Sequence, residues 1–182
     1  MLKPQEIRMS IYYSLFYEKI VSELNLNSAW RRFLGKKEPD LHMSEIEVLV
    51  RAFALLDMSE QYKAPLRNFL NDFSKKAMNY KEEKVASLSQ LFFDFWSSCD
   101  KLPKEAFRNE KNKFVISLFD AVFVTVCEKI RSEGLNGRII EPESLVKLKA
   151  DPTFSDASQG NTASATSVSN RLKRAREIIE LK

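Results

Sequence analysis

The segment from residue 111 to residue 131 is apolar on most sides of a predicted helix. Its large apolar residues are Phe114, Leu118, Phe119, Val122, Phe123, Val126 and Ile130. A helix of this kind must be covered on most sides by other parts of the chain. Ser117, Asp120 and Thr125 interrupt the segment, and it is shorter than the ~18 apolar residues that indicate a membrane span. We therefore expect a buried helix at the centre of a helical bundle.

Most of the remaining chain also has the apolar spacing of amphipathic helices. Residues 4–24 predict one helix with a single stripe, made of Ile7, Ile11, Tyr12, Leu15, Phe16, Ile20 and Leu24. Further helices are predicted over 28–34, 81–98 and 143–149, and after Ser44 and Pro65. Only 4 Gly and 6 Pro occur in 182 residues, whereas an all-β chain needs a turn about every 8–12 residues. We predict an all-α fold, a compact bundle of about six to eight helices.

Local signals mark several helix ends. Asn27 is suited to cap the helix over 28–34, and Gly35 is suited to end it in a left-handed conformation. Ser44 and Glu47 have the spacing of a capping box, in which Ser44 accepts a backbone hydrogen bond and Glu47 reaches back. Pro65 fits the first position of the next helix, because that position needs no backbone N–H.

The composition changes in the C-terminal part. Residues 151–170 are rich in Ser, Thr and Ala and contain no Lys or Arg, which on composition alone suggests a linker. A final helix is predicted over 164–181. Its apolar stripe consists of Val168, Leu172, Ala175 and Ile179. Because a stripe this regular needs a surface to bury it, we expect 1–150 to form the bundle and 151–182 to pack back on it, as one domain overall.

The two cysteines, Cys99 and Cys127, lie in apolar helical segments and outside any CxxC motif. These positions predict free, buried thiols in a reducing cytoplasm. The first ten residues are polar and lack the apolar region of a signal peptide. We therefore expect a cytoplasmic protein with no membrane contact. One His and two Cys cannot supply a Cys2His2 set, so we expect no metal site.

Candidate catalytic groups are few. His42 is the only histidine, and it lies in a predicted loop, where a surface or capping role competes with a role as general base. Asp94 and Asp120 lie in apolar helices, where an unpaired charge is costly. Each is either a buried acid of a site or the partner of a cation such as Arg51 or Arg108, and we favour the second. The chain contains no GxSxG, GxxxxGK[ST] or GxGxxG motif, so we expect no cofactor.

The chain carries 29 Lys and Arg against 25 Asp and Glu, a formal net charge of +4, which is compatible with nucleic acid but does not indicate it. The final helix is its best nucleic-acid candidate, through Arg171, Lys173, Arg174 and Arg176. Such a helix would contact phosphates without reading sequence, and salt would weaken it. The alternative is a solvated face beside the apolar stripe. The aromatic run at 92–96 contains no Lys or Arg, so it suits a packed helix better than a base-stacking platform.

Several short motifs stand in a collinear order that resembles one protein family. They are QEIR at 5–8, EVLVRAFA at 47–54, YKAPL at 62–66, FLNDF at 69–73, AFR at 106–108, LFDA at 118–121, Phe154 and Asn170-Arg171. The set resembles the C-terminal helical region of GmrSD-type proteins with a DGQQR motif. These are ParB/sulfiredoxin-like proteins of modification-dependent restriction and other anti-phage systems. The resemblance covers nearly the full chain, and FLNDF and the AFR–LFDA pair weigh most.

The resemblance implies structural roles for four motif residues, Arg51, Asn71, Arg108 and Asp120. In that family, nucleotide-dependent nuclease chemistry is attributed to an N-terminal α/β domain that carries the DGQQR motif. This sequence contains no DGQQR motif and no segment to hold it. The resemblance therefore carries over no catalytic residue, and we expect that this chain alone is not an enzyme.

The same resemblance implies that the Ser- and Thr-rich stretch is an ordered approach to the last helix, with Thr162 or Ser164 as its cap. Two positions depart from the family pattern. Met9 stands where the pattern has Asn, and His42 stands where it often has Arg.

Two hypotheses follow. In the first, the chain is a non-catalytic helical module of a restriction-type defence protein, which braces an α/β nuclease domain and is able to hold DNA. That domain would come from a separate chain, or be lost through a split or truncated gene. This hypothesis predicts an exposed apolar patch, with Tyr13, Phe16 and Tyr17 at its edge. In the second, the chain is a self-contained DNA-binding or regulatory protein, with a basic face and no such patch.

Overall fold

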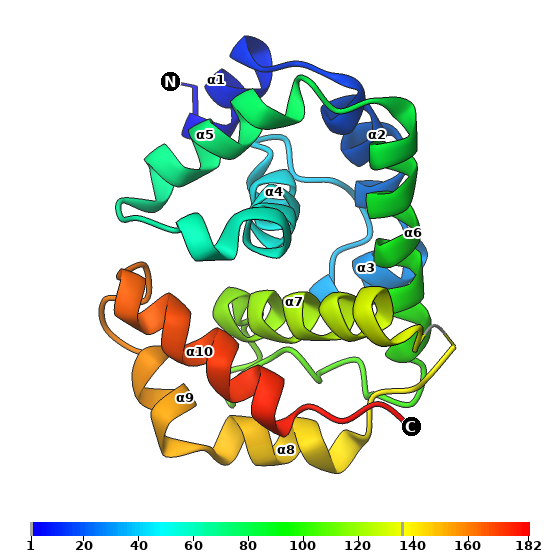
Figure 1. Cartoon of the computed structure of the whole chain (residues 1–182), viewed down its shortest axis with the longest axis vertical. Coiled ribbons are helices and arrows are strands. Elements are labelled where there is room, and N and C mark those ends of the chain that lie inside the picture. The colour runs from blue at the N-terminus through cyan, green and yellow to red at the C-terminus, as the bar shows by residue number, and fades with distance from the viewer. Residues whose placement is uncertain (1, 136) are drawn as a thin grey trace.

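The computed structural model describes residues 2–135 and 137–182 (Figure 1). Within these residues the chain forms ten α-helices and two 3-10 turns, and its only β pairing is two isolated bridges. The helices are α1 Pro4–Ile11, α2 Leu15–Ser22, α3 Ser28–Leu34, α4 Ser44–Met58, α5 Leu66–Ala77, α6 Glu82–Ser98, α7 Ile116–Glu133, α8 Pro142–Ala150, α9 Pro152–Ala157 and α10 Ala165–Ile178. The 3-10 turns are Leu24–Leu26 and Ser59–Gln61. The all-α prediction is confirmed, although the helices are more numerous than predicted.

The helix α7 lies across the middle of the molecule, as the apolar segment predicted (Figure 1). It packs against α4, α6 and α10, and 12 of its 18 residues are buried. It begins at Ile116 rather than near residue 111, because the residues before it form a loop. In that loop the Val115 amide donates to the Phe107 carbonyl oxygen at 2.8 Å. Packing on three sides explains why the segment needs apolar side chains around most of its circumference.

Aromatic side chains fill the space between α3, α6 and α7. Trp96 stacks on Phe119 with ring centroids 5.9 Å apart, and on Phe33 at 5.1 Å. Phe95 meets Phe123 edge to face at 5.0 Å. Offset and edge-to-face pairs of this kind add stability beyond the burial of their area. The run at 92–96 is therefore part of the core, and its packed-helix interpretation is confirmed.

The predicted helix over 4–24 is wrong as a single element. The chain leaves the helical path at Tyr12 to Ser14, and Ser14 is extended with φ near −163°. The stripe divides with it. Phe16, Ile20 and Leu24 are buried, but Ile7, Ile11 and Leu15 are exposed. The second part of the predicted stripe lies in the core, and in the first part Tyr12 alone packs against it, partly buried.

Two predictions about helix starts are also corrected. The N-cap of α4 is Met43, not Ser44, and Asp40 does the capping instead, because its carboxylate accepts from the amides of His42 and Ser44. Pro65 precedes the first residue of α5 rather than occupying it. Asn27 does cap α3, since its side chain accepts from the Trp30 amide at 3.0 Å.

The C-terminal part packs back on the bundle, with α10 lying against α7, α8 and α9 (Figure 1). Residues 151–170 contain the short helix α9 and then a turn in which the Ser164 hydroxyl accepts from the Ser167 amide at 3.0 Å. Ser164 is thus the cap that the resemblance implied, and the linker suggested by composition is absent from this described stretch. Both cysteines are free and buried. No helix in 2–135 or 137–182 combines the length and apolarity needed to cross a bilayer.

Candidate interaction surface

Three of the quoted motifs meet in one buried polar cluster under α1. Arg8 donates from Nε to the Asn71 side-chain oxygen at 3.0 Å, and its Nη1 pairs with Glu47 Oε2 at 3.1 Å. Nη1 also donates to the side-chain oxygen of Gln5. Gln5 and Arg8 are both buried. Charge-assisted bonds of this kind hold α1 onto α4 and α5, and Asn71 takes part through its bond to Arg8.

A second buried cluster joins α4, α7 and α10. Arg51 Nε lies 2.5 Å from Asp120 Oδ2, which confirms that Asp120 is the partner of a cation. Arg171 is buried nearby and donates to the carbonyl oxygens of Ala157 and, at 2.8 Å, Thr162. Burial raises the pKa of Asp120 to about 6, against the effect of the two guanidinium groups, and burial lowers the pKa of Arg171 to about 10. The cluster fastens the C-terminal part of the chain to the bundle.

Arg108 has a structural role of another kind. Its guanidinium donates to the carbonyl oxygens of Phe33 at 3.4 Å and of Asn112 at 3.2 Å. It lies directly under Gly35, where any Cβ atom would collide with Arg108 Nη2. Gly35 ends α3 with φ of 74°, as predicted. Asp94, the other acid in an apolar helix, is only half-buried and accepts from Gln90 at 2.8 Å.

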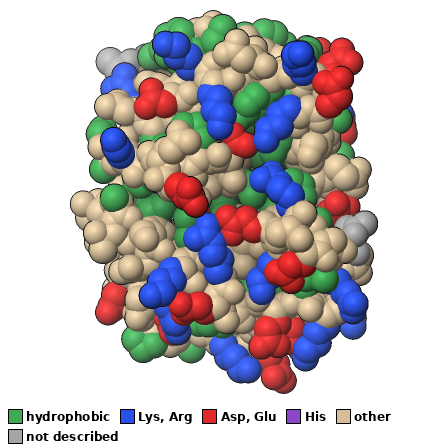
Figure 2. All heavy atoms as spheres, in the orientation of Figure 1, with side chains coloured by type: hydrophobic (Ala, Val, Ile, Leu, Met, Phe, Trp, Pro, Cys, Tyr) green, Lys and Arg blue, Asp and Glu red, His purple; other side chains and the backbone are tan. Residues whose placement is uncertain are grey.

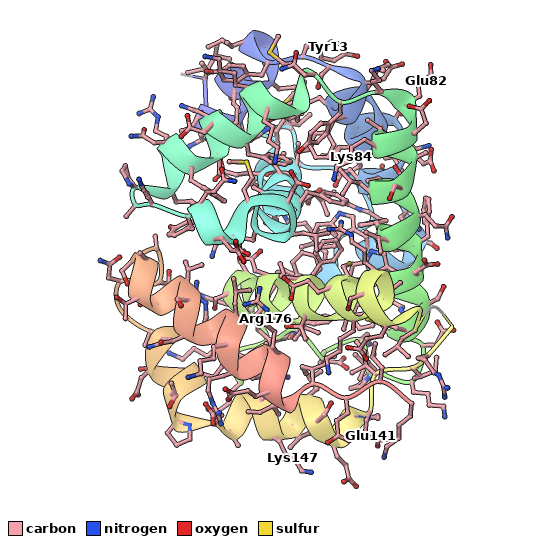
Figure 3. The ribbon with its side chains drawn as sticks, in the orientation of Figure 1. Tyr13, Glu82, Lys84, Glu141, Lys147 and Arg176 are labelled. Carbon is pink, nitrogen blue, oxygen red and sulfur yellow. The ribbon has the colours of Figure 1, made fainter. Side chains whose placement is uncertain are left out.

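The four basic residues predicted to contact DNA do not form one free cationic face. Arg171 is 2% exposed and points into the protein, so it has no surface to offer a phosphate. Arg174 pairs with Asp151 at 2.5 Å and with Glu177. Arg176 binds Glu128 through two bonds of 2.7 Å (Figure 3).

Lys173 is the exception among the four. It is exposed and has no carboxylate within ion-pair distance in the described residues. The sequence prediction counted the positive charges of α10, but the sequence does not show which groups accept their hydrogen bonds. Apart from Glu177, which lies on α10 itself, those acceptors come from 151–164 and from α7, which lie close to α10 only in the folded chain.

An ordinary surface helix places its apolar stripe toward the core. The helix α1 has the reverse orientation, because polar side chains face inward and the two isoleucines face solvent. In α1 the buried residues are Gln5 and Arg8. Ile7 and Ile11, one turn apart, are 41% and 60% exposed. Leu2, Tyr13 and Leu15 continue this exposed apolar set along the chain.

We call Leu2, Ile7, Ile11, Tyr13 and Leu15 the α1 face. It lies at the end of the molecule where α1 and α2 meet, and Tyr13 marks it in Figure 3. Apolar side chains are visible at this end in the space-filling view (Figure 2). Single exposed apolar residues are common, but several along one short segment mark an interaction surface.

The border of the α1 face toward α2 and α6 is acidic. Leu15 shares a shallow hollow of about 290 Å³ with Glu18, Glu23 and Glu82. Lys19, on the same hollow, is paired with Glu23. A partner with cations around an apolar centre would match this border.

The predicted edge of an apolar patch was partly wrong. Tyr13 is 59% exposed, as expected, but Phe16 and Tyr17 are fully packed in the core. Phe16 meets Phe53 and Phe73 edge to face, and the Tyr17 hydroxyl bonds Ser74 at 2.8 Å.

His42 is exposed, and its Nδ1 lies 3.9 Å from Glu6 Oε1. Across the described residues no group of three or more His, Cys, Asp or Glu side chains is placed to hold a metal ion. Among the described residues, these contacts place no set of catalytic side chains around His42.

Comparison with known proteins adds no relative. No family model, curated protein or solved structure matches the chain.

Proposed function

We propose that this chain is a non-catalytic helical module that docks onto a partner domain through the α1 face. The partner we propose is an α/β nuclease domain of the restriction type, which the motif resemblance in the sequence suggests. The module would brace that domain rather than perform chemistry. The observation that carries the proposal is the reversed orientation of α1, with Arg8 buried and Ile7 and Ile11 in solvent.

The cost of this orientation supports the proposal. Burying a guanidinium requires bonded partners, and the chain supplies Gln5, Glu47 and Asn71 for Arg8. Rotating α1 would bury the isoleucines and return the arginine to water. The folded chain instead fixes α1 with its apolar side outward, which a docking surface requires.

The acidic border specifies the partner further. We propose that the partner's contact surface carries Lys or Arg around an apolar centre, opposite Glu18 and Glu82. Rim charges of this kind act mainly on the association rate, and salt screens them. Raising the salt concentration should therefore slow association while the apolar contact keeps the complex together.

The test is affinity purification of the tagged chain from the cells that encode it, with bound polypeptides quantified by mass spectrometry. The test variant is Ile7→Glu combined with Ile11→Glu, which places two charges on the α1 face. The matched control is Val146→Glu, because Val146 is also exposed, on α8 at the far end of the molecule (Figure 1). Circular dichroism checks that each variant is folded.

We expect the unmodified chain and the Val146 variant to retain a polypeptide with a DGQQR motif, and the double variant to lose it. Equal recovery by all three chains would refute the docking surface. Recovery of no such polypeptide by any of them would refute the proposed partner.

A second candidate function is nucleic-acid binding, and one observation favours it. The loop before α7 carries Lys101, Lys104, Lys111 and Lys113 against Glu105 and Glu110, with Lys104 paired to Glu105. Arg108 joins this loop to the end of α3, where Lys37 lies. Anisotropy of a labelled DNA duplex at several salt concentrations tests it. The paired substitution Lys111→Glu and Lys113→Glu should abolish binding if this loop holds phosphates, whereas Lys173→Glu should not.

A further inference from the structure

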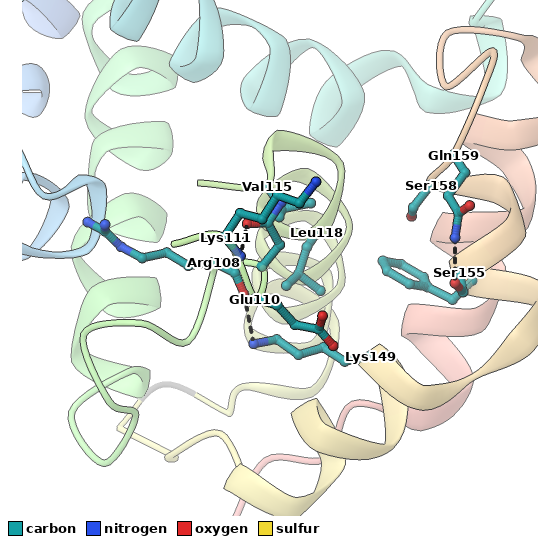
Figure 4. Close-up of a pocket in the computed structure, with 11 residues that line it drawn as sticks. Arg108, Glu110, Lys111, Val115, Leu118, Lys149, Ser155, Ser158 and Gln159 are labelled. Carbon is teal, nitrogen blue, oxygen red and sulfur yellow. Dashed lines mark hydrogen bonds between the residues drawn. The ribbon is translucent and has the colours of Figure 1, made fainter. Parts of the chain in front are cut away.

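A pocket of about 610 Å³ lies between the loop before α7, the end of α8 and α9 (Figure 4). Its size falls within the roughly 300–1,000 Å³ of small-molecule sites. The floor is apolar, formed by Val115, Leu118 and Phe154. Of the four structural motif residues only Arg108 lines this pocket, and it does so with its backbone, while its side chain extends away toward α3 (Figure 4).

Two lysines lie on the walls of this pocket, Lys111 and Lys149. Lys149 has no carboxylate within ion-pair distance among the described residues, and its one bond is to the Arg108 carbonyl oxygen at 3.5 Å. Partial burial lowers the pKa of Lys149. Glu110 is the one acid on the lining. The walls therefore carry more positive than negative charge, next to an apolar floor.

The α9 side of the pocket offers a hydrogen-bond donor that the protein does not use. Ser158 Oγ is buried and has no partner in the described residues, and Figure 4 shows it directed into the pocket. Its neighbours Ser155 and Gln159 bond each other at 3.1 Å. Leaving a buried hydroxyl without a partner costs free energy, so the α9 wall carries a hydroxyl that the described residues do not satisfy.

The loop that forms the opposite wall is held in shape by its own bonds. Asn109 Oδ1 accepts from the amides of Lys111 and Lys113, both at 3.0 Å. Asn112 adopts a left-handed conformation with φ of 56°. A wall fixed in this way loses little freedom when a ligand binds, which favours affinity.

We propose that this pocket binds a small organic anion with an aromatic or aliphatic body. The body lies on Val115, Leu118 and Phe154, and its phosphate or carboxylate group accepts from Lys149 Nζ, on the side of the pocket opposite Ser158 (Figure 4). The pocket is separate from the α1 face, which lies on other helices.

The probe for the test is 1-naphthyl phosphate, titrated into the full chain and followed by the backbone amide signals in NMR. The neutral compound 1-naphthol is the matched ligand control, since it keeps the ring and lacks the anion. The test variant is Lys149→Met, which keeps the apolar stem. The control variant is Lys147→Met, because Lys147 is exposed on the same helix and outside the pocket (Figure 3).

We expect 1-naphthyl phosphate to shift the amides of Ser155, Ser158 and Gln159, and to bind more tightly than 1-naphthol. Losing one charge-assisted bond should weaken binding about tenfold in Lys149→Met. Lys147→Met should bind as the unmodified chain does. Absence of binding, equal affinity for 1-naphthol, shifts confined to α1 and α2, or unchanged affinity in Lys149→Met would overturn the proposal.

Discussion

Replacing Arg171 with Met tests whether the basic helix α10 serves the fold rather than nucleic acid. Met keeps a long apolar side chain and removes the guanidinium. The carbonyl oxygens of Ala157 and Thr162 then lose their donor, and Asp120 loses one of its two nearby cations. Breaking a buried charged network in this way costs about 3–5 kcal/mol. That is a large share of the roughly 5–15 kcal/mol that stabilises an ordinary domain.

Urea unfolding followed by circular dichroism measures this loss. With an m-value of about 1–3 kcal/mol/M, the unfolding midpoint should fall by about 2 M. Lys173→Met is the matched control, since Lys173 is exposed on the same helix and pairs with no carboxylate in the described chain. It should change the free energy of unfolding by no more than about 0.5 kcal/mol. A loss below about 1 kcal/mol in Arg171→Met, or an equal loss in both variants, would refute the reasoning.

Three further predictions concern stability. Gly35→Ala should lower the free energy of unfolding by about 1–3 kcal/mol, because φ is +74° and the new Cβ would meet Arg108. Gly160→Ala should lower it less, because φ is +61° and the space around Gly160 is open. Equal shifts in melting temperature would show that Arg108 moves aside freely. Phe119→Ala should cost about 3–5 kcal/mol in urea unfolding, since Phe119 is fully buried among aromatic rings, and a loss near 1 kcal/mol would contradict that packing. The free energy of unfolding should fall as the pH drops below about 4, and Asp57→Asn should reduce this pH dependence. If the variant kept the unchanged pH profile, Asp57 would be ruled out as the source of the pH dependence.

The sign of the Asp57 prediction follows from its contacts. Burial alone would raise the pKa of this carboxyl, but bonds from Lys76, Lys84 and Tyr80 hold it well below its usual range. A group whose pKa is depressed on folding stabilises the folded state above its unfolded pKa. That contribution is complete near neutral pH and disappears as the pH falls through the lower, folded value.

The sequence predicts the core well where burial alone decides the structure. The segment of α7 is apolar on most sides, and only a central position satisfies it, so its role could be read without knowing its neighbours. The stripe of α10 likewise required a surface, and α7 supplies it. That Asp120 pairs with a cation also followed, because an acid in an apolar helix needs one; the sequence left Arg51 and Arg108 open, and the fold brings Arg51 to Asp120.

The sequence could not predict which side of α1 faces inward. Residues 4–11 contain an apolar pair, Ile7 and Ile11, and a polar pair, Gln5 and Arg8, and periodicity favours burying the first. The opposite arrangement depends on Glu47 and Asn71, which lie 39 and 63 residues from Arg8. Local spacing carries no information about such distant partners, so the α1 face appears only in the folded chain.

The most direct test of the docking proposal is site-specific photo-crosslinking in the cells that encode the chain. A photoreactive phenylalanine analogue replaces Tyr13 on the α1 face, and in a second chain it replaces Val146, which is exposed on α8 at the far end of the molecule (Figure 1). We expect position 13 to crosslink to a polypeptide with a DGQQR motif and position 146 not to do so. No crosslink to such a polypeptide from position 13, or equal crosslinking from both positions, would contradict the account.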